Sequence, residues 1–480
     1  MISQKKTPYL FVSRNCPALI ALFLLALSTT MRADPTLPSF GSSVFNVTVS
    51  NPKIAGGATM STNNSAASNA SVLNAFITYC STNTAGGIGG AVEVPAGTYS
   101  LNQILLKKNV NLQIDTNCVL QDANFTNTLV TYSGTVTNVE ISGGGIIDGN
   151  ATTVASGNKL VYLSGVKNLE ITNISVENAG NEHLAVEHAT NVTISGVTIA
   201  DPRTLAANNG AYLPNTDGID FWGTNFLIKN CNVADGDDDI CAKPASGPCA
   251  SIVITNCTIG AGHGISIGGG TAFGLSNMLV TTCTFNGTTN GIRIKACDIS
   301  GSDSGGGTNF PVTGVTYNNI TMSNVANPIV IESFYNGSDT FPSSPTNRTY
   351  YPTNPTAVDS FTPIYENIAF DNIEITNAAN AGYIQGLYTT PLSINTLSFS
   401  NVTISAARAM EMWYATNVDV SGGLSVTLPT NSAYANATPI RGVWSYNLTG
   451  LVVPEPSTYA LLALGSLVMV LAWRRKDAKE

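Results

Sequence analysis

The sequence predicts an all-β protein in which parallel strands stack into one long solenoid. A short pattern recurs, and each copy holds two alternating strands rich in Ile, Val and Thr, broken in the middle by Asn, Gly or Ser. The copies begin at residues 168, 191, 225, 251, 277, 314, 367 and 396. Their spacings vary from 23 to 53 residues, as expected when each coil keeps a fixed strand core and carries loops of variable length. Helical periodicity is scarce outside the two ends of the chain.

A β-sandwich is the competing fold for a chain with so many short strands. Sandwich hairpins favour two-residue turns at regular short spacing, whereas these spacings suit one full coil per copy. The 480 residues are 43% hydrophobic and 11% charged, which supplies a large core and excludes an intrinsically disordered chain.

The first elements along the chain are expected to be a leader and a cap. Residues 1–33 are expected to be a signal peptide, because a basic start precedes an apolar run from Ala18 to Leu27. Segment 67–79 has a helical pattern and is expected to cover the open end of the solenoid, where strand edges would otherwise be exposed. The runs that begin at residues 92 and 110 are expected to form the first coils.

Residues 452–480 form a C-terminal tail of a different kind. Pro-Glu-Pro-Ser-Thr comes first, an apolar run from Tyr459 to Trp473 follows, and three basic residues at 474–476 close it. This order resembles the PEP-CTERM-type sorting tail of exported bacterial proteins that an exosortase processes. A simple C-terminal transmembrane anchor is the alternative. We expect the solenoid domain, 34–451, to lie outside the cytoplasm or on the cell surface, with transient membrane anchoring through the tail.

The formal net charge of −9 argues against nucleic acid and anionic membranes as partners, because both would be repelled. An acidic ligand would need a local basic site. A monomer is expected.

Eight cysteines follow the signal segment. Cys231, Cys257 and Cys283 are separated by 26 residues each in equivalent contexts, so we expect a stack of buried thiols in successive coils. Cys241 and Cys249 flank a Pro-Gly loop and are the expected disulfide pair.

Four polar clusters fall on consecutive copies of the pattern. They are NTDGID at 215–220, GDDD at 236–239, GHGISIG at 262–268 and GIRIK at 291–295. Equivalent residues lie 21 to 30 residues apart, about one coil, so they are expected to stack on one face about 4.8 Å from their neighbours. One strip of the surface would then carry, in order, an Asp, an Asp pair, a His, and an Arg with a Lys.

This strip has the groups needed to break a glycosidic bond in an acidic sugar. Two neighbouring carboxylates are pushed to different pKa values, so that one stays protonated as an acid while the other is ionised as a base. Arg293 and Lys295 alternate with Ile292 and Ile294, which puts both cations on the same face of a strand. A guanidinium beside an ammonium binds a carboxylate, so the implied substrate is an acidic sugar.

Some of these residues also have structural or metal-binding interpretations. Four Asp within 235–239 suit a calcium site in number but lack the ligand spacing of an EF-hand, so no metal or other cofactor is expected. Asp220 or Asp235 alone is better explained as a turn or solvated residue. His263 lies between two glycines on the coil after the Asp cluster and is expected to be functional, whereas His183 and His188 lack such neighbours.

In this order the four clusters resemble the polygalacturonases and related pectin hydrolases, glycoside hydrolase family 28. The resemblance covers most of the chain and includes VPAGTY at 94–99, GGGIIDGN at 143–150 and FYNG at 334–337. It implies a single right-handed parallel β-helix and metal-independent hydrolysis of α-1,4 bonds between galacturonic acid units, with inversion at the anomeric carbon. The substrate would be polygalacturonate or another pectin-type acidic polysaccharide.

The resemblance also assigns roles to particular residues. The implied catalytic residues are Asp217, Asp237, Asp238 and His263, and the implied substrate-binding residues are Arg293, Lys295 and Tyr335. Asp237 would be the general acid, Asp217 and Asp238 would position and deprotonate the attacking water, and His263 would tune the protonation of the acid. The basic pair and the tyrosine would hold the uronate.

Two points of geometry complicate this assignment. Stacked coils put carboxylates about one rung apart, nearer to the roughly 5 to 5.5 Å of retaining glycosidases than to the roughly 6.5 to 9.5 Å of inverting ones. Adjacent residues of a regular strand face opposite sides, so Asp237 and Asp238 both reach the cleft only if the backbone bends, which Gly236 permits. The alternative working pair, Asp238 with Asp239, stays open.

Other functions fit parts of the sequence. A pectate lyase would need calcium and a basic residue that removes a proton, and a rhamnogalacturonan hydrolase would act on a related substrate. A non-catalytic adhesin or carbohydrate-binding surface solenoid would need only the repeats. The strip of Asp, His and Arg with Lys favours the hydrolase. Endo or exo attack stays open, because sequence does not place the insertions at 301–310 and 336–362.

Overall fold

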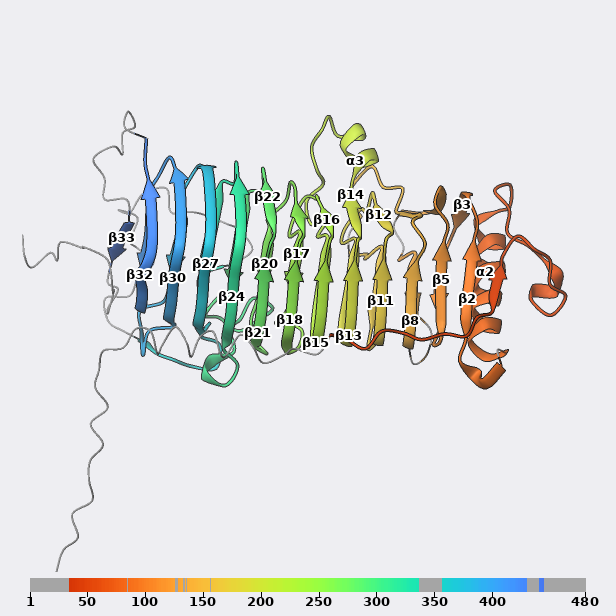
Figure 1. The fold of residues 1–480 in the computed structure, drawn as a ribbon, viewed down its shortest axis with the longest axis horizontal. Helices are drawn as coiled ribbons and strands as arrows, with labels where there is room; N and C mark the ends of the chain where they lie inside the picture. Colours follow the sequence, from red (N-terminus) through yellow and green to blue (C-terminus); the bar gives the residue numbers. More distant parts are fainter. Residues whose placement is uncertain are drawn as a thin grey trace, which may run out of the picture. The chain divides into compact units, whose positions relative to one another are not determined.

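The structure, a computed structural model, describes residues 34–335, apart from 84, 126–127, 133, 135 and 156, together with residues 356–429 and 440–443. Within these ranges 31 strands join in one sheet through parallel ladders and wind into a right-handed parallel β-helix (Figure 1). Each ladder joins a strand to its counterpart one coil further along the chain. The predicted fold class is confirmed, and the antiparallel pairing of a β-sandwich does not fit.

Three faces make up the coils. The first face consists of β1 (Val44–Asn46), β2 (Gly90–Val94), β5 (Val110–Ile114), β8 (Thr137–Ser142), β11 (Lys167–Thr172), β13 (Leu184–Ser195), β15 (Ile219–Lys229), β18 (Cys249–Thr255), β21 (Leu275–Thr281), β24 (Val312–Ser323), β27 (Tyr365–Ala378), β30 (Ile394–Ala406) and β32 (Ala415–Thr427). The second consists of β3 (Gly97–Leu101), β6 (Cys118–Asp122), β9 (Ile146–Asp148), β12 (Ser175–Glu177), β14 (Thr198–Ala200), β16 (Asn232–Val233), β19 (Thr258–Ile259) and β22 (Thr284–Asn286).

The third face carries the polar clusters. It consists of β4 (Ile104–Leu106), β7 (Val130–Tyr132), β10 (Val161–Ser164), the first residues of β13 and β15, β17 (Ile240–Ala242), β20 (Ile265–Ile267), β23 (Asn290–Lys295), β25 (Asn327–Glu332), β28 (Tyr383–Gln385), β31 (Met410–Trp413) and β33 (Ile440–Val443). A separate pair of strands is formed by β26 (Thr356–Ala357) and β29 (Thr389–Thr390). The helices are α2 (Ala66–Asn83), α3 (Pro202–Ala207) and the 3-10 turns η1 (Ala55–Gly57), η2 (Ala85–Gly87) and η3 (Gly307–Asn309).

The break inside each copy of the repeat is a sharp corner between the first and second faces. At Asn173, Asn230 and Asn256 the corner residue has a φ between 52° and 55°. Asparagine tolerates this left-handed conformation because its short side chain bonds locally. The Asn256 amide also donates to Oδ1 of Asn230 at 2.7 Å, so the corners are tied from coil to coil. In the copies at 314, 367 and 396 the two short strands run on as one.

Apolar side chains from all faces fill the interior. Ile240, Ile265 and Ile292 are register partners on the third face, and all three are fully buried in the core. Since side chains alternate along a strand, the neighbours of these isoleucines point outward and form a second stack. This outward stack holds the polar clusters.

The cysteines confirm one prediction and contradict another. Cys231, Cys257 and Cys283 are buried, unbridged members of the core, as predicted. The predicted disulfide between Cys241 and Cys249 is wrong, because both thiols are free. Cys249 belongs to the core, whereas Cys241 stands between two core residues of β17 and points outward, where its thiol donates to the Gly268 carbonyl at 2.8 Å.

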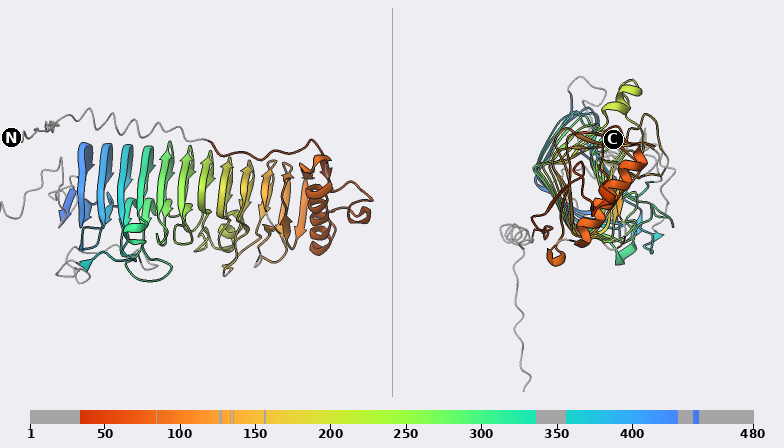
Figure 2. Two further views of the ribbon diagram at one scale, coloured as in Figure 1. Left: turned by 90° about the horizontal axis from the view of Figure 1, so that it is seen from below. Right: turned by 90° about the vertical axis from the view of Figure 1, so that its right-hand side faces the viewer.

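The helix α2 covers the N-terminal end of the solenoid, as predicted for segment 67–79. It contacts β2, β3, β4 and β5 and lies across that end of the coils (Figure 2). Its side chains Leu73, Phe76 and Ile77 are buried against the first coils. Two elements were not predicted: β1, which adds a strand in front of β2, and α3, which begins with Pro202 directly after Asp201.

The expected signal peptide at 1–33 and the expected sorting tail at 452–480 lie outside the described residues. The contacts divide the chain into Met1–Asp34 and Pro35–Glu480, and every helix and strand named above lies in the second unit. None of the described helices has the length and apolar character needed to cross a bilayer.

Candidate active site

The four polar clusters lie on neighbouring coils of the third face. The strand β15 pairs with β17, β17 with β20, and β20 with β23, all in parallel register. In this register the outward partners, coil by coil, are Asp220, Cys241, Ser266 and Arg293. Of these register partners, only Arg293 belongs to the predicted strip. Asp217, Asp238 and His263 each stand two residues before a strand partner, namely Ile219, Ile240 and Ile265, so these three occupy equivalent positions on consecutive coils.

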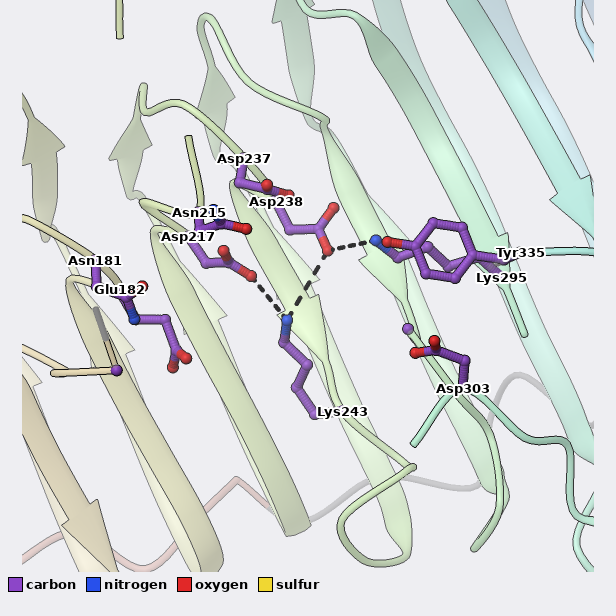
Figure 3. A pocket seen from close by; sticks show the side chains of 12 residues that line it. Asn181, Glu182, Asn215, Asp217, Asp237, Asp238, Lys243, Lys295, Asp303 and Tyr335 are labelled. Atoms are coloured by element: carbon purple, nitrogen blue, oxygen red, sulfur yellow. Dashed lines mark hydrogen bonds and ion pairs between the residues drawn. The ribbon is translucent and has the colours of Figure 1, made fainter. Parts of the chain in front are cut away.

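The strip borders an open pocket of about 420 Å³ (Figure 3). The pocket is lined by Gly157, Asn181, Glu182, Asn215, Asp217, Asp237, Asp238, Lys243, Gly269, Lys295, Asp303 and Tyr335. Five of the predicted site residues are among them. The other two, His263 and Arg293, contact the carboxylates that line it.

Asp238 is the most enclosed of the lining acids, with 1% of its surface exposed. Its Oδ1 accepts hydrogen bonds from Arg293 and from the Ser266 hydroxyl, and its Oδ2 lies 3.0 Å from the Lys295 ammonium. Burial alone would raise the pKa of Asp238, but Arg293 and Lys295 outweigh burial and hold this pKa well below its usual range. Asp238 is therefore an ionised hydrogen-bond acceptor, suited to orient a water.

Asp237 is the more accessible member of the pair, with 23% of its side chain exposed. Its Oδ1 lies 3.0 Å from Nδ1 of His263. Burial raises the pKa of Asp237, but the interactions with His263 and Lys295 together outweigh burial, so the net shift is downward. This contact lies at the edge of the pocket, where a ligand can reach Asp237.

The Lys243 ammonium lies close to three carboxylates, which come from two coils. This ammonium lies 2.7 Å from Asp217, 3.1 Å from Asp220 and 3.9 Å from Asp238. Burial would lower the pKa of Lys243, but the carboxylates around it raise it well above its usual value, so the cation stays charged. Burial raises the pKa of Asp217, and Lys243 acts against that rise. Asp220 lies within β15 and is 3% exposed, so the expectation of a turn or solvated residue is wrong.

The basic pair is not a free carboxylate clamp. Arg293 is 1% exposed and Lys295 3% exposed, and both are bound to Asp238. Only Lys295 lines the pocket, with its ammonium 4.5 Å from the centre of the Tyr335 ring. Arg293 lies further from that ring, at 6.0 Å. The last two residues of the FYNG motif, 336 and 337, are outside the described residues.

Asp237 and Asp238 both reach the site because they lie in the loop between β16 and β17 rather than in a strand. The backbone bends at Gly236, as required. A Cβ on Gly236 would lie only 1.8 Å from the Leu213 carbonyl oxygen, so a close backbone approach demands glycine there. Asp239 turns away from the pocket, where its Oδ2 accepts the Gly264 N–H at 2.7 Å.

Asp235 belongs to the turn before the working pair, and its Oδ1 accepts the Asp237 N–H at 2.9 Å. It is fully buried, so it is not a solvated residue.

Among the described residues, Asp237, Asp238 and His263 are close enough to ligate one metal ion, with one donor atom of each within 4.8 Å of the others. This donor set does not suit a divalent cation, because both oxygens of Asp238 already bind cationic side chains. A metal ion would have to compete with Arg293 and Lys295 for the same carboxylate.

Sequence reasoning missed several residues of the site. Ser266 stands inside GHGISIG and Lys243 follows GDDD by four residues, and strand alternation places both on the outward face with Arg293. Glu182 and Asp303 come from loops that follow no repeat, so no spacing predicts them. They line opposite ends of the pocket (Figure 3).

His183 has a buried acidic neighbour that its sequence context does not indicate. It is fully buried, its Nε2 lies 3.1 Å from Oδ1 of Asp201, and its N–H donates to the Asp217 carbonyl at 2.8 Å. The sequence did not indicate this buried acidic partner, and His183 also supports the backbone that carries Asp217, since its Nδ1 lies 3.3 Å from the same carbonyl oxygen. His188 is exposed and stacks on the Trp222 ring at 5.0 Å, away from the pocket-lining set.

Comparison with known families gives two matches. The model of glycosyl hydrolases family 28 matches residues 80–350, and the model of the PEP-CTERM protein-sorting motif matches residues 452–476. The chain is 37% identical over 177 residues to a probable polygalacturonase of Arabidopsis thaliana and 37% identical over 180 residues to an endo-polygalacturonase of Pectobacterium parmentieri. These alignments cover 36% and 37% of this chain, and 35% and 40% of the relatives' own length.

Solved structures share the fold at lower sequence identity. A family 28 exopolygalacturonase of Yersinia enterocolitica superposes with a TM-score of 0.65 at 17% identity, covering 85% of this chain and 78% of that one. An endo-xylogalacturonan hydrolase of Aspergillus tubingensis superposes with a TM-score of 0.57 at 21% identity, covering 81% of this chain and 99% of that one. At these identities the likeness shows the fold alone.

Proposed function

The chain belongs to glycosyl hydrolases family 28, and from this membership we propose that it hydrolyses α-1,4 bonds between galacturonic acid units of pectin-type polysaccharides. One observation carries the proposal. Asp237, which lies 3.0 Å from His263, stands beside an ionised carboxylate, Asp238, which is surrounded by cations. An acid and a base kept in opposite protonation states are what glycosidic hydrolysis needs.

In this proposal Asp237 donates a proton to the leaving oxygen, and His263 supplies that proton through their hydrogen bond. Asp238 and Asp217 hold the attacking water and accept its proton. Lys243, between these two carboxylates, keeps them ionised. Lys295 and Tyr335 bind the uronate. Arg293, which is bound to Asp238 and does not line the pocket, attracts the uronate electrostatically.

We further propose that the reaction inverts the anomeric carbon. Asp217 and Asp238 both lie close to the Lys243 ammonium, and in this proposal the attacking water binds between the two carboxylates. Proton NMR during the first turnovers would distinguish the outcomes, because inversion of an α-linkage yields β-galacturonate first. Initial release of the α-anomer would mean retention and a covalent intermediate.

The PEP-CTERM motif at 452–476 supports a proposal for localisation. We propose that the chain is exported, that residues 1–33 are removed as a signal peptide, and that an exosortase-type enzyme processes the tail. The catalytic domain would then be 34–451, acting as a monomer outside the cytoplasm.

The deciding experiment is incubation with polygalacturonate in the presence of a chelator, with reducing ends and ultraviolet absorbance followed together. Hydrolysis predicts new reducing ends without unsaturated products and with full activity in chelator. A calcium-dependent lyase would give absorbing, chelator-sensitive products, and a carbohydrate-binding solenoid would bind the polymer without releasing any ends. Activity on rhamnogalacturonan alone would mean that the substrate is not polygalacturonate, but the reaction class would still be hydrolysis.

A further inference from the structure

The proposed function assigns no role to the end of the pocket formed by Asn181 and Glu182. On the basis of that function, we propose that this end binds a sugar without a free carboxylate. The enzyme would then cleave a galacturonan best where the residue on this side is methyl-esterified or is replaced by a neutral sugar.

The two ends of the pocket differ in charge. Figure 3 shows Asn181 and Glu182 on one side of Lys243, and Lys295 and Tyr335 on the other. At the second end two cations, Arg293 and Lys295, stand behind Asp238. Asp303 also lines that end, so the charges there are close to balanced.

The charge at the Glu182 end is negative. Lys159 lies 2.9 Å from Glu182 and 2.6 Å from Glu187, so one ammonium is shared by two carboxylates. Burial would lower the pKa of Lys159, but the two glutamates raise it above its usual value, so the lysine is already a full cation and has no more charge to offer. One negative charge is left over, and Glu182 presents it to the pocket.

The nearest lining cation does not compensate this charge. Lys243 and Lys295 are the basic residues among the described pocket lining, and Lys243 is held by Asp217, Asp220 and Asp238. A uronate at this end would therefore face Glu182 without an available counter-charge. Like charges a few ångströms apart in a partly exposed site weaken binding by roughly tenfold.

An uncharged pyranose fits the same groups well. Its hydroxyls can donate to the Glu182 carboxylate and exchange hydrogen bonds with the side-chain amides of Asn181 and Asn215, which also line the pocket. A methyl-esterified galacturonate and a neutral sugar share this chemistry. The two candidates differ in the methyl ester group, which the neutral sugar lacks. Oligosaccharides that carry either an ester or a neutral sugar at this position therefore show which of the two the pocket prefers.

The test compares kcat/KM on three sets of oligosaccharides: unesterified galacturonate oligomers, the same oligomers with methyl esters, and oligomers that alternate uronate with a neutral sugar. The enzymes are the wild type, Glu182→Gln and the control Glu170→Gln. Glu170 lies on β11 of the first face, so the control removes the same charge away from the pocket.

We expect Glu182→Gln to raise kcat/KM on unesterified oligomers about tenfold but not to raise it on uncharged partners, whose hydroxyls lose a charged acceptor, while Glu170→Gln changes neither value. Added salt should reduce the difference in kcat/KM between wild type and Glu182→Gln on unesterified oligomers, because salt screens the repulsion between Glu182 and the uronate. The wild type's preference between ester and neutral sugar identifies the natural source.

Cleavage of unesterified oligomers with the same kcat/KM in wild type and Glu182→Gln would overturn the inference and leave the proposed function standing. Absence of cleavage of every galacturonan by all three enzymes would overturn the proposed function itself, and the inference with it.

Discussion

The ammonium of Lys243 lies 2.7 Å from Oδ2 of Asp217, at the centre of the candidate active site. The same ammonium reaches Asp220 and Asp238, so one cation holds three carboxylates that come from two neighbouring coils. Without it these carboxylates would repel one another, and at least one would take up a proton. Lys243 therefore acts against the rise in pKa that burial gives Asp217 and Asp220.

Replacement of Lys243 by methionine is expected to shift the pH dependence of activity. Removal of the cation raises the pKa of Asp217 further, so the ionised form that the reaction needs is lost at a higher pH. The acidic limb of kcat/KM should move upward by about one to two pH units. Lys243→Arg keeps the charge and should stay close to wild type. A uniform loss of activity with an unmoved limb would contradict this role.

Asp237→Asn and Asp238→Asn should differ in how much unfolding free energy each variant loses. Asp238→Asn is expected to lower kcat by several orders of magnitude and to cost about 3 kcal/mol of unfolding free energy, because Arg293 and Lys295 are left buried without their counter-charge. Asp237→Asn should lower kcat similarly but cost less than about 1 kcal/mol, since Asp237 is partly exposed. Urea unfolding of both variants measures the difference, and equal stability losses would argue against the buried ion cluster.

Lys295 is expected to act in binding. Lys295→Met should raise KM for galacturonan about tenfold, because the lining cation at that end of the pocket is lost. The matched control is Lys167→Met, on the exposed start of β11. Unchanged kinetics in Lys295→Met would count against binding of a uronate at this end. Steady-state assays on oligomers of defined length separate the effect on KM from that on kcat.

The strip of site residues was predictable because coil length is nearly constant between 215 and 295. Residues in equivalent positions stack, so Asp217, Asp238 and His263, each two residues before a strand partner, had to come close once the solenoid was recognised. Arg293 continues the stack of Asp220, Cys241 and Ser266 on the same face. The bend at Gly236 followed from the need for two adjacent acids in one cleft.

The spacing of the repeats did not predict which side chains of the strip contact one another. Arg293 reaches Asp238 across an intervening coil, and only the lengths of the side chains and the hydroxyl of Ser266 between them decide this contact. Glu182 enters from a loop, where the repeat imposes no spacing. The absence of a Cys241–Cys249 disulfide depends on which way each side chain points, and short sequence separation says nothing about that.

The buried pair of His183 and Asp201 is expected to make stability depend on pH. Burial would lower the pKa of His183, but Asp201 outweighs burial, so the pKa in the folded chain lies above the value of about 6.5 for an unfolded histidine. A raised pKa stabilises the fold fully below that value, and the contribution fades as pH rises through the folded pKa. His183→Asn should therefore cost about 3 kcal/mol near pH 6 and progressively less towards pH 9.

Urea unfolding at a series of pH values measures this difference against wild type. His188→Asn is the matched control, because His188 is exposed, and its effect should be small at every pH. Because Nδ1 of His183 also lies 3.3 Å from the Asp217 carbonyl oxygen, His183→Asn should also lower kcat in the folded enzyme, whereas a purely local packing role would leave kcat intact. A stability deficit that stays constant across the pH range would mean that His183 is neutral in the fold, and the ion pair with Asp201 would have to be abandoned.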